Sequence, residues 1–401
     1  MSHVVVVGAG QAAASLVAKL RAKGFGGQIT VIGEESAPPY QRPPLSKAYL
    51  LGEMELDRLF LRPEAWFAEN DVTLRLGARV EAIDRDAKTV TVGDDKISYD
   101  MLALTTGAVP NRLPNAIGGD LDGVYCVRTL ADVDAMAPEF REGAKVLIVG
   151  GGYIGLEAAA VAAKKGLRVT LVEMSERILQ RVAAPQTSDY FRALHREHGV
   201  DIREGVGLAQ LTGEARVSGA ELGDGTSLDV DFVIVGVGIK PDIAVAEQAG
   251  LTIDNGIAVD AEGRTSDPSI WAAGDCASFP KGDGRMRLES VGNAIDMGEL
   301  VAENMLGAGT AYVPRPWFWS DQYAVKLQIA GLGTGYDEIV TRQGEGSVSF
   351  WYYRGDDLLA IDAMNDPRAY MIGKRLIEAG RTADPALVAD PSADLKALLT
   401  A

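Results

Sequence analysis

The hydrophobic pattern begins with a short apolar run, Val4 to Val7, followed by the turn Gly8-Ala9-Gly10-Gln11-Ala12-Ala13. Apolar residues then recur at helical spacing, Leu16 and Leu20 among them. A short apolar run bounded by glycine predicts a buried strand, and the spacing after it predicts a helix. This order of strand, turn and helix is the context that a dinucleotide-binding glycine motif requires.

The same pattern returns in the middle of the chain. Val146 to Val149 predicts a second buried strand, Gly150-Gly151-Gly152-Tyr153-Ile154-Gly155 forms the turn, and an alanine-rich helix is expected through Lys165. Glycines at these positions allow a tight turn and let the backbone approach a pyrophosphate, which the helix N-terminus attracts. One such motif is a weak signal, but two with correct flanking elements predict two bound dinucleotides.

Each motif is followed by an acidic residue at the end of the next predicted strand. The strand at 28–32 leads to Glu34 and Glu35, either of which suits the role, and the strand at 168–172 leads to Glu173. A carboxylate there accepts hydrogen bonds from ribose hydroxyls. The candidate contacts within the two motifs are Gly8, Gly10, Ala13, Gly150, Gly152, Tyr153, Ile154 and Gly155.

Further apolar segments indicate that the second nucleotide-binding domain is inserted into the first. We expect a hairpin region at 72–92, a strand at 101–104, a strand beginning at 232, a short strand ending in Gly274-Asp275, and a helix at about 291–306. After Pro316, strict alternation predicts an antiparallel sheet with a helix packed on it. The segments are 323–330, 336–342, 347–353 and 358–363 for the strands and 368–379 for the helix.

The fold class predicted from these elements is α/β, with two Rossmann-like dinucleotide-binding domains and a C-terminal α+β domain built on an antiparallel sheet. The first domain is expected to be discontinuous, over 1–109 and 241–314. The second covers 110–240, and the C-terminal domain covers 315–401.

Composition narrows the class of protein. A chain of 401 residues with 47% hydrophobic and 24% charged residues is typical of a large globular enzyme. The net charge of −17 argues against nucleic acid or an anionic membrane as a partner. With no basic leader and no uninterrupted apolar helix, we expect a cytoplasmic protein. Cys126 and Cys276 lie far apart in sequence, so we expect two small buried side chains rather than a disulfide or metal site.

Several segments resemble one family over essentially the whole chain. The sequence is similar to the flavoprotein ferredoxin reductases of bacterial oxygenase systems, the putidaredoxin reductase and dioxygenase ferredoxin reductase family, which has the glutathione-reductase-like fold. The segments that carry the resemblance are Arg42-Pro43-Pro44-Leu45-Ser46-Lys47, Gly150 to Glu157, Gly274-Asp275-Cys276, Glu289 to Ala294, and Pro316-Trp317-Phe318-Trp319-Ser320-Asp321-Gln322-Tyr323.

The resemblance implies that FAD binds the first motif and a nicotinamide nucleotide binds the second. It also implies that Asp275 accepts a hydrogen bond from a ribityl hydroxyl of the flavin. Without the family context, Gly274-Asp275 would be an ordinary turn. The remaining cofactor-binding candidates are Arg42, Lys47, Thr106, Gly107, Gly274, Val291 and Gly238.

Glu173 predicts which nicotinamide nucleotide is used. A carboxylate at this position accepts from a 2′-hydroxyl and repels a 2′-phosphate, so we expect NADH rather than NADPH. Arg177 and Arg181 lie close in sequence and are expected to be solvated helix charges.

Lys47 and Glu157 are the catalytic candidates nearest the flavin ring. The resemblance implies that the lysine lies beside the reactive edge of the flavin and that the glutamate approaches it near the nicotinamide. Hydride transfer needs alignment and electrostatics rather than a general base. Taken alone, Lys47 would be a solvated loop lysine and Glu157 a first-turn acid favoured by the helix dipole.

Residues 36–52 contain no cysteine, whereas the disulfide and peroxide reductases of this fold carry redox cysteines there. Electrons must therefore leave the flavin without a thiol relay, and we expect them to pass singly to a [2Fe–2S] ferredoxin that feeds a cytochrome P450 or a ring-hydroxylating dioxygenase. Two alternatives stay open: an NADH oxidase, which the missing cysteine disfavours, and a flavoprotein whose NADH-bound state signals to a protein partner.

Other candidates are weaker. The resemblance places the Trp317–Trp319 segment near the flavin and the ferredoxin-facing surface, so Trp319 is kept as a catalytic candidate, although both tryptophans read first as core aromatics. His195 and His198 have helical spacing, and an exposed helix face is expected rather than a metal site. Cations of suitable sign for docking an acidic ferredoxin are Arg42, Arg315, Lys326, Arg368, Lys374 and Arg375.

Overall fold

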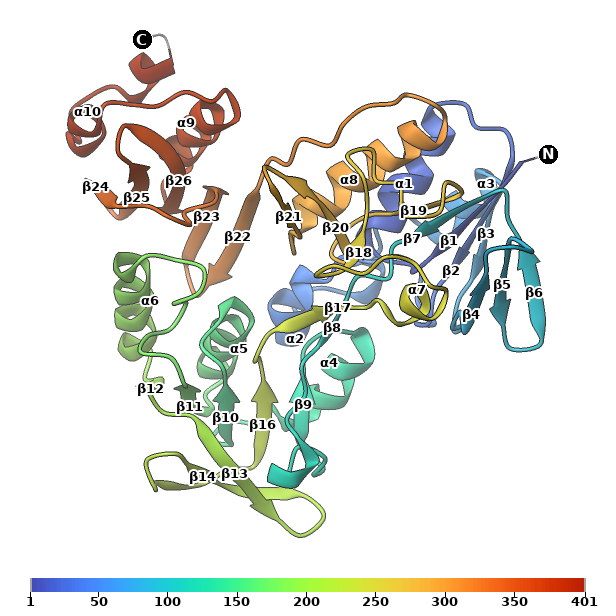
Figure 1. Cartoon of the computed structure of the whole chain (residues 1–401). Helices are drawn as coiled ribbons and strands as arrows, with labels where there is room; N and C mark the ends of the chain where they lie inside the picture. The colour runs from blue at the N-terminus through green and yellow to red at the C-terminus, as the bar shows by residue number, and fades with distance from the viewer. Residues whose placement is uncertain (1, 400–401) are drawn as a thin grey trace. The chain divides into compact units, whose positions relative to one another are not determined.

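The computed structural model describes residues 2–399 (Figure 1). The chain divides into two compact units. The first unit comprises the chain through Arg42, then Glu55–Val109 and Ile239–Pro316. The second comprises Pro43–Met54, Pro110–Gly238 and the chain from Trp317 onward. The segment 43–54, which carries Lys47, thus leaves the first nucleotide-binding fold and packs with the second unit.

The first unit is built on a five-stranded parallel sheet in the order β19-β7-β1-β2-β3. Its strands are nearly continuous apolar runs because the sheet is covered on both faces. Helix α8 packs along helix α1. The bounds are β1 His3–Val7, α1 Gln11–Ala22, β2 Gln28–Ile32, β3 Val72–Arg75, β7 Met101–Leu104, β19 Ile270–Ala272 and α8 Val291–Met305.

The expected hairpin at 72–92 is wrong in its first strand. Val72–Arg75 joins the parallel sheet as edge strand β3, and a separate antiparallel sheet forms from β4, β5 and β6. The other elements of this unit are η2 Leu56–Arg58, α3 Glu64–Glu69, β4 Ala82–Asp84, β5 Thr89–Val92, β6 Asp95–Ser98, β8 Ala108–Pro110, β17 Ile239–Pro241, α7 Ala244–Gln248, β18 Ile257–Ala258, β20 Ala277–Lys281 and β21 Gly284–Met286.

The second unit repeats the parallel-sheet design in the order β12-β11-β10-β16-β9. Its elements up to β16 are η1 Pro43–Ser46, α2 Ala48–Leu51, η3 Asn115–Ile117, β9 Val124–Cys126, α4 Leu130–Met136, η4 Ala137–Glu139, β10 Lys145–Val149, α5 Tyr153–Lys164, β11 Arg168–Glu173, α6 Pro185–Glu197, β12 Asp201–Glu204, β13 Leu208–Gly213, β14 Val217–Leu222, β15 Ser227–Asp229 and β16 Phe232–Val235.

The end of the chain forms an antiparallel sheet in the order β22-β23-β26-β25-β24, with helix α9 packed on β23 and β26. Four of its strands match the predicted alternating segments. The fifth, β22, contains the Trp-Phe-Trp sequence and was not expected as a strand. The bounds are β22 Trp317–Gln322, β23 Val325–Gly331, β24 Glu338–Gly344, β25 Ser347–Arg354, β26 Asp357–Met364, α9 Pro367–Glu378, α10 Pro385–Ala389 and η5 Leu395–Leu399.

In both parallel sheets, strand order reverses beside the strand that precedes the glycine motif. The reversal falls between β1 and β7 in the first unit and between β10 and β16 in the second. Open α/β sheets bind their ligands at the carboxyl ends of the strands, at such a switch point. The fold therefore places each glycine motif where a nucleotide site is expected, and the α/β class is confirmed.

Candidate functional site: two nucleotide cradles and a buried ion pair

The first cradle lies where β1 turns into α1. Gly8 has φ +102, and a Cβ atom there would lie 2.3 Å from the carbonyl oxygen of Thr105, which follows β7. Only glycine tolerates both the conformation and this approach. Gly10 is the N-cap of α1, supplies no side-chain cap, and would place a Cβ in open space. Ala13 is fully buried beneath it. A bare helix N-terminus with open space before it fits a pyrophosphate.

The two acidic candidates after β2 differ in their surroundings. Glu35 is half-buried and accepts hydrogen bonds from the Tyr40 hydroxyl and the Arg42 guanidinium, both at 2.6 Å. Glu34 is exposed and pairs with Arg79 at 2.9 Å. Glu35 is therefore the carboxylate held in one orientation, and Arg42 is one of the two side chains that hold it.

Candidates from three distant segments meet at one edge of the first sheet. Thr106 and Gly107 follow β7, and Gly274 and Asp275 follow β19, which pairs with β7. Because the strands are parallel, their carboxyl ends share the edge on which Gly8 lies. The hydroxyl of Thr106 donates to the Asp242 carbonyl, and Gly107 has φ +71.

The chain passes close to α1 at Gly274. Its φ is +81, and a Cβ there would lie 3.1 Å from the Cβ of Ala12. Asp275 follows in a half-buried position, and its carbonyl accepts a hydrogen bond from Arg287. Val291 is the first residue of α8 and is half-buried.

The second cradle repeats the first. Gly150 has φ +109, and a Cβ there would lie 2.4 Å from the Gly236 carbonyl oxygen after β16. Gly155 is pressed against the Gly150 carbonyl, with a Cβ distance of 2.1 Å. Gly152 is the N-cap of α5, supplies no side-chain cap and faces open space. This geometry also fits a pyrophosphate.

The side chains that follow Gly152 point to different surroundings. Ile154 is exposed, whereas the Tyr153 hydroxyl is buried with no hydrogen-bond partner among the described residues. Burial, together with the nearby Asp362, raises the pKa of Tyr153 well above its ordinary value. The Tyr153 ring packs on Phe318, with centroids 4.8 Å apart.

Glu173 stands at the end of β11 and is fixed by backbone amides. Its carboxylate accepts from the N–H groups of Gly151 and Ser175, at 2.7 and 2.8 Å. The expectation of a solvated Arg177 is wrong: its guanidinium donates to the Ser188 hydroxyl and to the Ala183 carbonyl at 2.9 Å. These contacts turn Arg177 into the loop before α6.

Arg181 is exposed and lies near Gly238. Gly238 has φ +95, and a Cβ there would lie 3.6 Å from an Arg181 nitrogen and 3.4 Å from the Asn111 amide. Gly238 thus follows β16 in a conformation that favours glycine.

Lys47 and Glu157 form a buried ion pair in the second unit, with 2.9 Å between Nζ and Oε1. Glu157, on α5, is 2% exposed and Lys47 is 16% exposed. Ser46 donates to Oε2 and Ser320 donates to Oε1, each at 2.7 Å. Burial raises the pKa of Glu157, while Lys47 and the two hydroxyls oppose the rise. The interpretation of Lys47 as a solvated loop lysine is therefore wrong. The interpretation of Glu157 as a first-turn acid is wrong as well, because α5 begins at Tyr153 and Glu157 is buried beyond its first turn.

The two serines are site residues that sequence reasoning missed. Both stand inside the segments that carry the family resemblance, Ser46 before Lys47 and Ser320 after Trp319. Hydroxyls in a loop and in a strand give no chemical signal in sequence. Their role appears only because 46 and 320 meet at Glu157.

Trp317 and Trp319 lie half-buried on β22, with stacked rings 5.5 Å apart. The Nζ of Lys374 lies 5.3 Å from the Trp317 ring centroid. Neither tryptophan is a fully buried core residue, as their sequence alone had suggested, because β22 pairs on one side only.

The expected exposed helix face at His195 and His198 is wrong for His195. Its side chain is fully buried, whereas His198 is exposed. Among residues 2–399, no group of three or more metal-ligating side chains is found. Cys126 and Cys276 are both buried free thiols, as expected.

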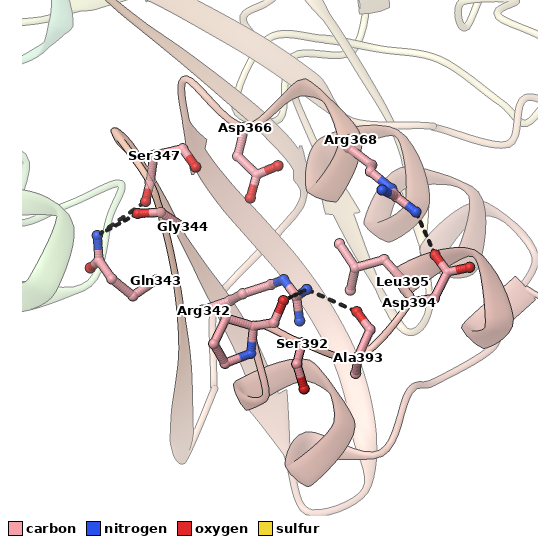
Figure 2. Close-up of a pocket in the computed structure, with 11 residues that line it drawn as sticks. Arg342, Gln343, Gly344, Ser347, Asp366, Arg368, Ser392, Ala393, Asp394 and Leu395 are labelled. Carbon is pink, nitrogen blue, oxygen red and sulfur yellow. Dashed lines mark hydrogen bonds and ion pairs between the residues drawn. The ribbon is translucent and has the colours of Figure 1, made fainter.

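A pocket of about 400 Å³ lies in the C-terminal part of the second unit (Figure 2). The guanidinium of Arg342 donates to main-chain carbonyls of the terminal segment, among them Val388 and Ala393, each at 3.0 Å. Arg368 at its rim pairs with Asp394. No cofactor-binding candidate lines this pocket, so we assign it a structural role.

Comparison with known proteins agrees with this arrangement. The pyridine nucleotide-disulphide oxidoreductase family matches residues 2–298, and the reductase C-terminal domain matches residues 317–399. The chain is 43% identical to a ferredoxin–NAD(P)(+) reductase of Sphingomonas sp., over 99% of this chain and 97% of that protein. It is 40% identical to putidaredoxin reductase of Pseudomonas putida, over 100% and 97% of the two chains.

Among solved structures, the covalent putidaredoxin reductase–putidaredoxin complex is similar, with a TM-score of 0.96 and 38% identity, covering 100% of this chain and 98% of that one. The chain belongs to the pyridine nucleotide-disulphide oxidoreductase family. The resemblance seen in sequence is confirmed, and the protein is an oxidoreductase that uses FAD and NAD(P)H. Within the described part of the chain, no helix combines the length and apolar character needed to span a membrane.

Proposed function

We propose that the protein is an NADH:ferredoxin reductase. It takes a hydride from NADH and delivers electrons singly to a [2Fe–2S] ferredoxin that feeds a cytochrome P450 or a ring-hydroxylating dioxygenase. The observation that carries the proposal is the similarity, over essentially full length, to proteins named as ferredoxin and putidaredoxin reductases, including the C-terminal domain. The two glycine cradles supply the matching pair of nucleotide sites.

The first cradle is assigned to FAD, with the discontinuous domain 1–109 and 241–314 as its binding domain. Gly8, Gly10 and Ala13 would receive the pyrophosphate, and Glu35 the adenosine ribose. Asp275 would accept from a ribityl hydroxyl, with Thr106, Gly107, Gly274 and Val291 on the same sheet edge. Bound FAD supplies the step from hydride to single electrons.

The second cradle is assigned to the nicotinamide nucleotide, within domain 110–240. Gly150, Gly152, Tyr153, Ile154 and Gly155 would hold it, with Gly238 on the facing loop. The amide contacts of Glu173 orient its carboxylate toward a ribose, where a 2′-phosphate would be repelled. Because Arg177 is turned into its own loop, it cannot offset that repulsion, and this supports NADH as the reductant.

Glu173→Ala tests the choice of nucleotide. The KM for NADH should rise about 10-fold, as expected for losing a hydrogen bond donated to a charged acceptor, and the preference for NADH over NADPH should become smaller. The matched control is Glu176→Ala, because Glu176 is exposed three residues away. An unchanged NADH/NADPH ratio would refute the assignment of Glu173.

Lys47 and Glu157 are proposed to serve the reactive edge of the flavin, as the family resemblance implies. Their pairing holds the ammonium of Lys47 in one place, where it would favour negative charge on a reduced acceptor. Ser46 and Ser320 donate hydrogen bonds that fix the Glu157 carboxylate, and the paired ammonium of Lys47 is fixed with it. The residues position and polarise; no general base is required.

Electrons are proposed to leave over the β22 side of the second unit. Both cysteines are buried and lie outside residues 36–52, so no thiol relay is available there. Trp319 on β22 is the aromatic candidate at this exit. Lys326 and Arg375 are exposed and suit an acidic ferredoxin. Lys374 lies against Trp317 and also pairs with Glu378 at 3.5 Å. The case is weaker for Arg368 and Arg42, which pair with Asp394 and Glu35.

The docking proposal predicts a salt-dependent on-rate. Lys326→Gln and Arg375→Gln should each lower the ferredoxin on-rate at low ionic strength and flatten its fall with added salt. Lys164→Gln, on an exposed position of α5, serves as the control. A wild-type on-rate that does not change with salt would point to an apolar dock.

Anaerobic stopped-flow spectroscopy at flavin wavelengths tests the function itself. The protein is reduced with NADH and then mixed with oxidised [2Fe–2S] ferredoxin or with oxygen. Fast reoxidation by ferredoxin and slow reaction with oxygen are expected. Fast reaction with oxygen alone would mean NADH oxidase chemistry, and slow reoxidation by every acceptor would favour the signalling flavoprotein. We propose the cytoplasm as the compartment, since NADH is generated there.

A further inference from the structure

A chain of buried polar side chains runs from helix α6 to the Lys47–Glu157 pair. His195 Nε2 lies 2.8 Å from Gln322 Oε1, Gln322 Nε2 lies 3.1 Å from Ser320 Oγ, and Ser320 Oγ lies 2.7 Å from Glu157 Oε1. His195, Gln322 and Ser320 are each fully buried. Three elements, α6, β22 and α5, therefore contribute to one continuous hydrogen-bonded chain.

The donor and acceptor in every hydrogen bond of this chain follow from the carboxylate at one end. A carboxylate only accepts, so Ser320 donates to Glu157 and must accept from Gln322. The Gln322 amide then turns its oxygen to His195, which must carry its proton on Nε2. Tyr323 completes the order, because its hydroxyl lies 3.2 Å from His195 Nδ1 and donates to it.

The surroundings of His195 keep it in that one form. Burial lowers the pKa of His195 to about 4, and the exposed His198 stacked on Tyr323 acts in the same direction. Tyr323 reaches the imidazole from the β22–β23 turn, where it adopts φ +55. A neutral imidazole with a fixed tautomer gives the chain a permanent donor at its far end.

We propose that His195, Gln322 and Ser320 are positioning residues that hold Glu157 ionised and directed at Lys47. All dipoles in the chain point their positive ends toward the carboxylate, and successive bonds polarise one another. An amide in the middle means that the chain orients charge rather than carrying protons. The inference rests on the proposed function only for the step from Glu157 to hydride transfer.

Other groups that face Glu157 also influence its protonation. Lys47 and Ser46 approach from the 43–47 segment, and the Tyr153 hydroxyl lies on Glu157's own helix, α5. Among these, Lys47 is the charged partner in contact. Asp362 is a separate buried carboxyl that bonds to Thr187 and Tyr352 and is not linked to the chain.

The test measures Glu157 directly in the FAD-loaded protein by infrared titration of buried carboxyl bands. Glu157→Gln and Asp362→Asn assign the two bands. Ser320→Ala should raise the titration midpoint of Glu157 by about one pH unit, the equivalent of one hydrogen bond to a charged group. Gln322→Met and His195→Phe should raise it by successively less, because each removes a more distant donor.

Two controls separate the chain from general damage to the fold. His195→Gln restores an N–H near Nε2 and should return the midpoint toward wild type. Thr187→Val removes an equally buried hydrogen bond outside the chain and should leave it unchanged. The protein has three histidines, so its imidazole ¹⁵N spectra are simple. They should show His195 as the neutral Nε2–H tautomer from pH 5 to 9.

The outcomes separate this inference from the proposed function. A Glu157 midpoint that stays put in Ser320→Ala and His195→Phe, or a His195 proton on Nδ1, would overturn the chain. A midpoint that moves as predicted, together with a matching shift in the pH profile of flavin reduction by NADH, supports both. If the midpoint moves and the reduction rate does not, the chain stands and the catalytic assignment of Glu157 falls.

Discussion

Removing the cation of the buried ion pair is the perturbation with the largest predicted effect on stability. In Lys47→Met, Glu157 keeps its carboxylate and loses the ammonium 2.9 Å from Oε1. At that separation and an effective dielectric constant of 20, the Coulomb attraction is about 6 kcal/mol. Desolvation offsets part of it, and breaking such pairs costs about 3–5 kcal/mol, so Lys47→Met should destabilise by about that amount.

The destabilisation should depend on pH in a defined direction. Without Lys47, burial leaves the folded-state pKa of Glu157 raised above its unfolded value. The folded state then binds more protons between those two pKa values, so stability falls as pH rises through this window. Lys47→Met should accordingly lose less stability at pH 5 than at pH 8.

A double-mutant cycle, with urea unfolding at a fixed excess of FAD, measures the coupling energy between Lys47 and Glu157. Glu157→Gln removes the unpaired charge, so the double variant should be more stable than Lys47→Met alone, with a coupling energy of about 2–4 kcal/mol. The control is Lys164 with Glu53, which has a similar 2.8 Å distance but is about half exposed. Its coupling should stay below about 1 kcal/mol. Equal coupling in both cycles would refute the reasoning.

Three further predictions concern the second unit. Gly150→Ala should destabilise by about 2 kcal/mol or more because of its positive φ and the 2.4 Å approach to a carbonyl, whereas Gly152→Ala should leave stability unchanged and weaken NADH binding by calorimetry. Wild type should lose about 2 kcal/mol more stability than His195→Gln when the pH falls from 7 to 4.5. The reason is that the imidazole becomes protonated in the unfolded state over this range, whereas the buried imidazole stays neutral. Parallel curves of stability against pH for the two proteins would contradict burial of a neutral His195. Arg342→Met should release the terminal segment, seen as faster proteolysis after residue 384, since its guanidinium holds main-chain carbonyls there.

Sequence predicted the two cradles well because their signals are local. The apolar runs at 4–7 and 146–149, the glycine turns and the helices after them follow from backbone sterics and periodicity within about 20 residues. The same holds for four strands of the last sheet, where alternation marks one buried face. Strand β3 was missed because four residues that pair with β2 look no different from a hairpin strand until the sheet is assembled.

The site that joins Lys47 to Glu157 shows where sequence reasoning ended. Without its flanking motif, Lys47 would be read as a loop lysine. No feature of the neighbouring sequence predicts that it is buried against α5. His195 looked exposed because its neighbours Arg196 and Glu197 are polar. In the folded protein its side chain is fully buried and bonds to Gln322, 127 residues away.

By itself, the sequence determined the class of fold, the two glycine turns between strand and helix, the carboxylate at Glu173 and the lack of cysteine in residues 36–52. These depend on side-chain type and short-range spacing, which the chain carries in any conformation. Tertiary structure alone decided which of Glu34 and Glu35 is held in place, how Arg177 turns, and which hydroxyls and amide surround Glu157. The first two depend on loop conformations that bring residues 5 to 11 positions apart into hydrogen bonds, and the third on hydrogen bonds between segments more than 100 residues apart. Side-chain type does not specify these contacts, because they form only when the chain packs.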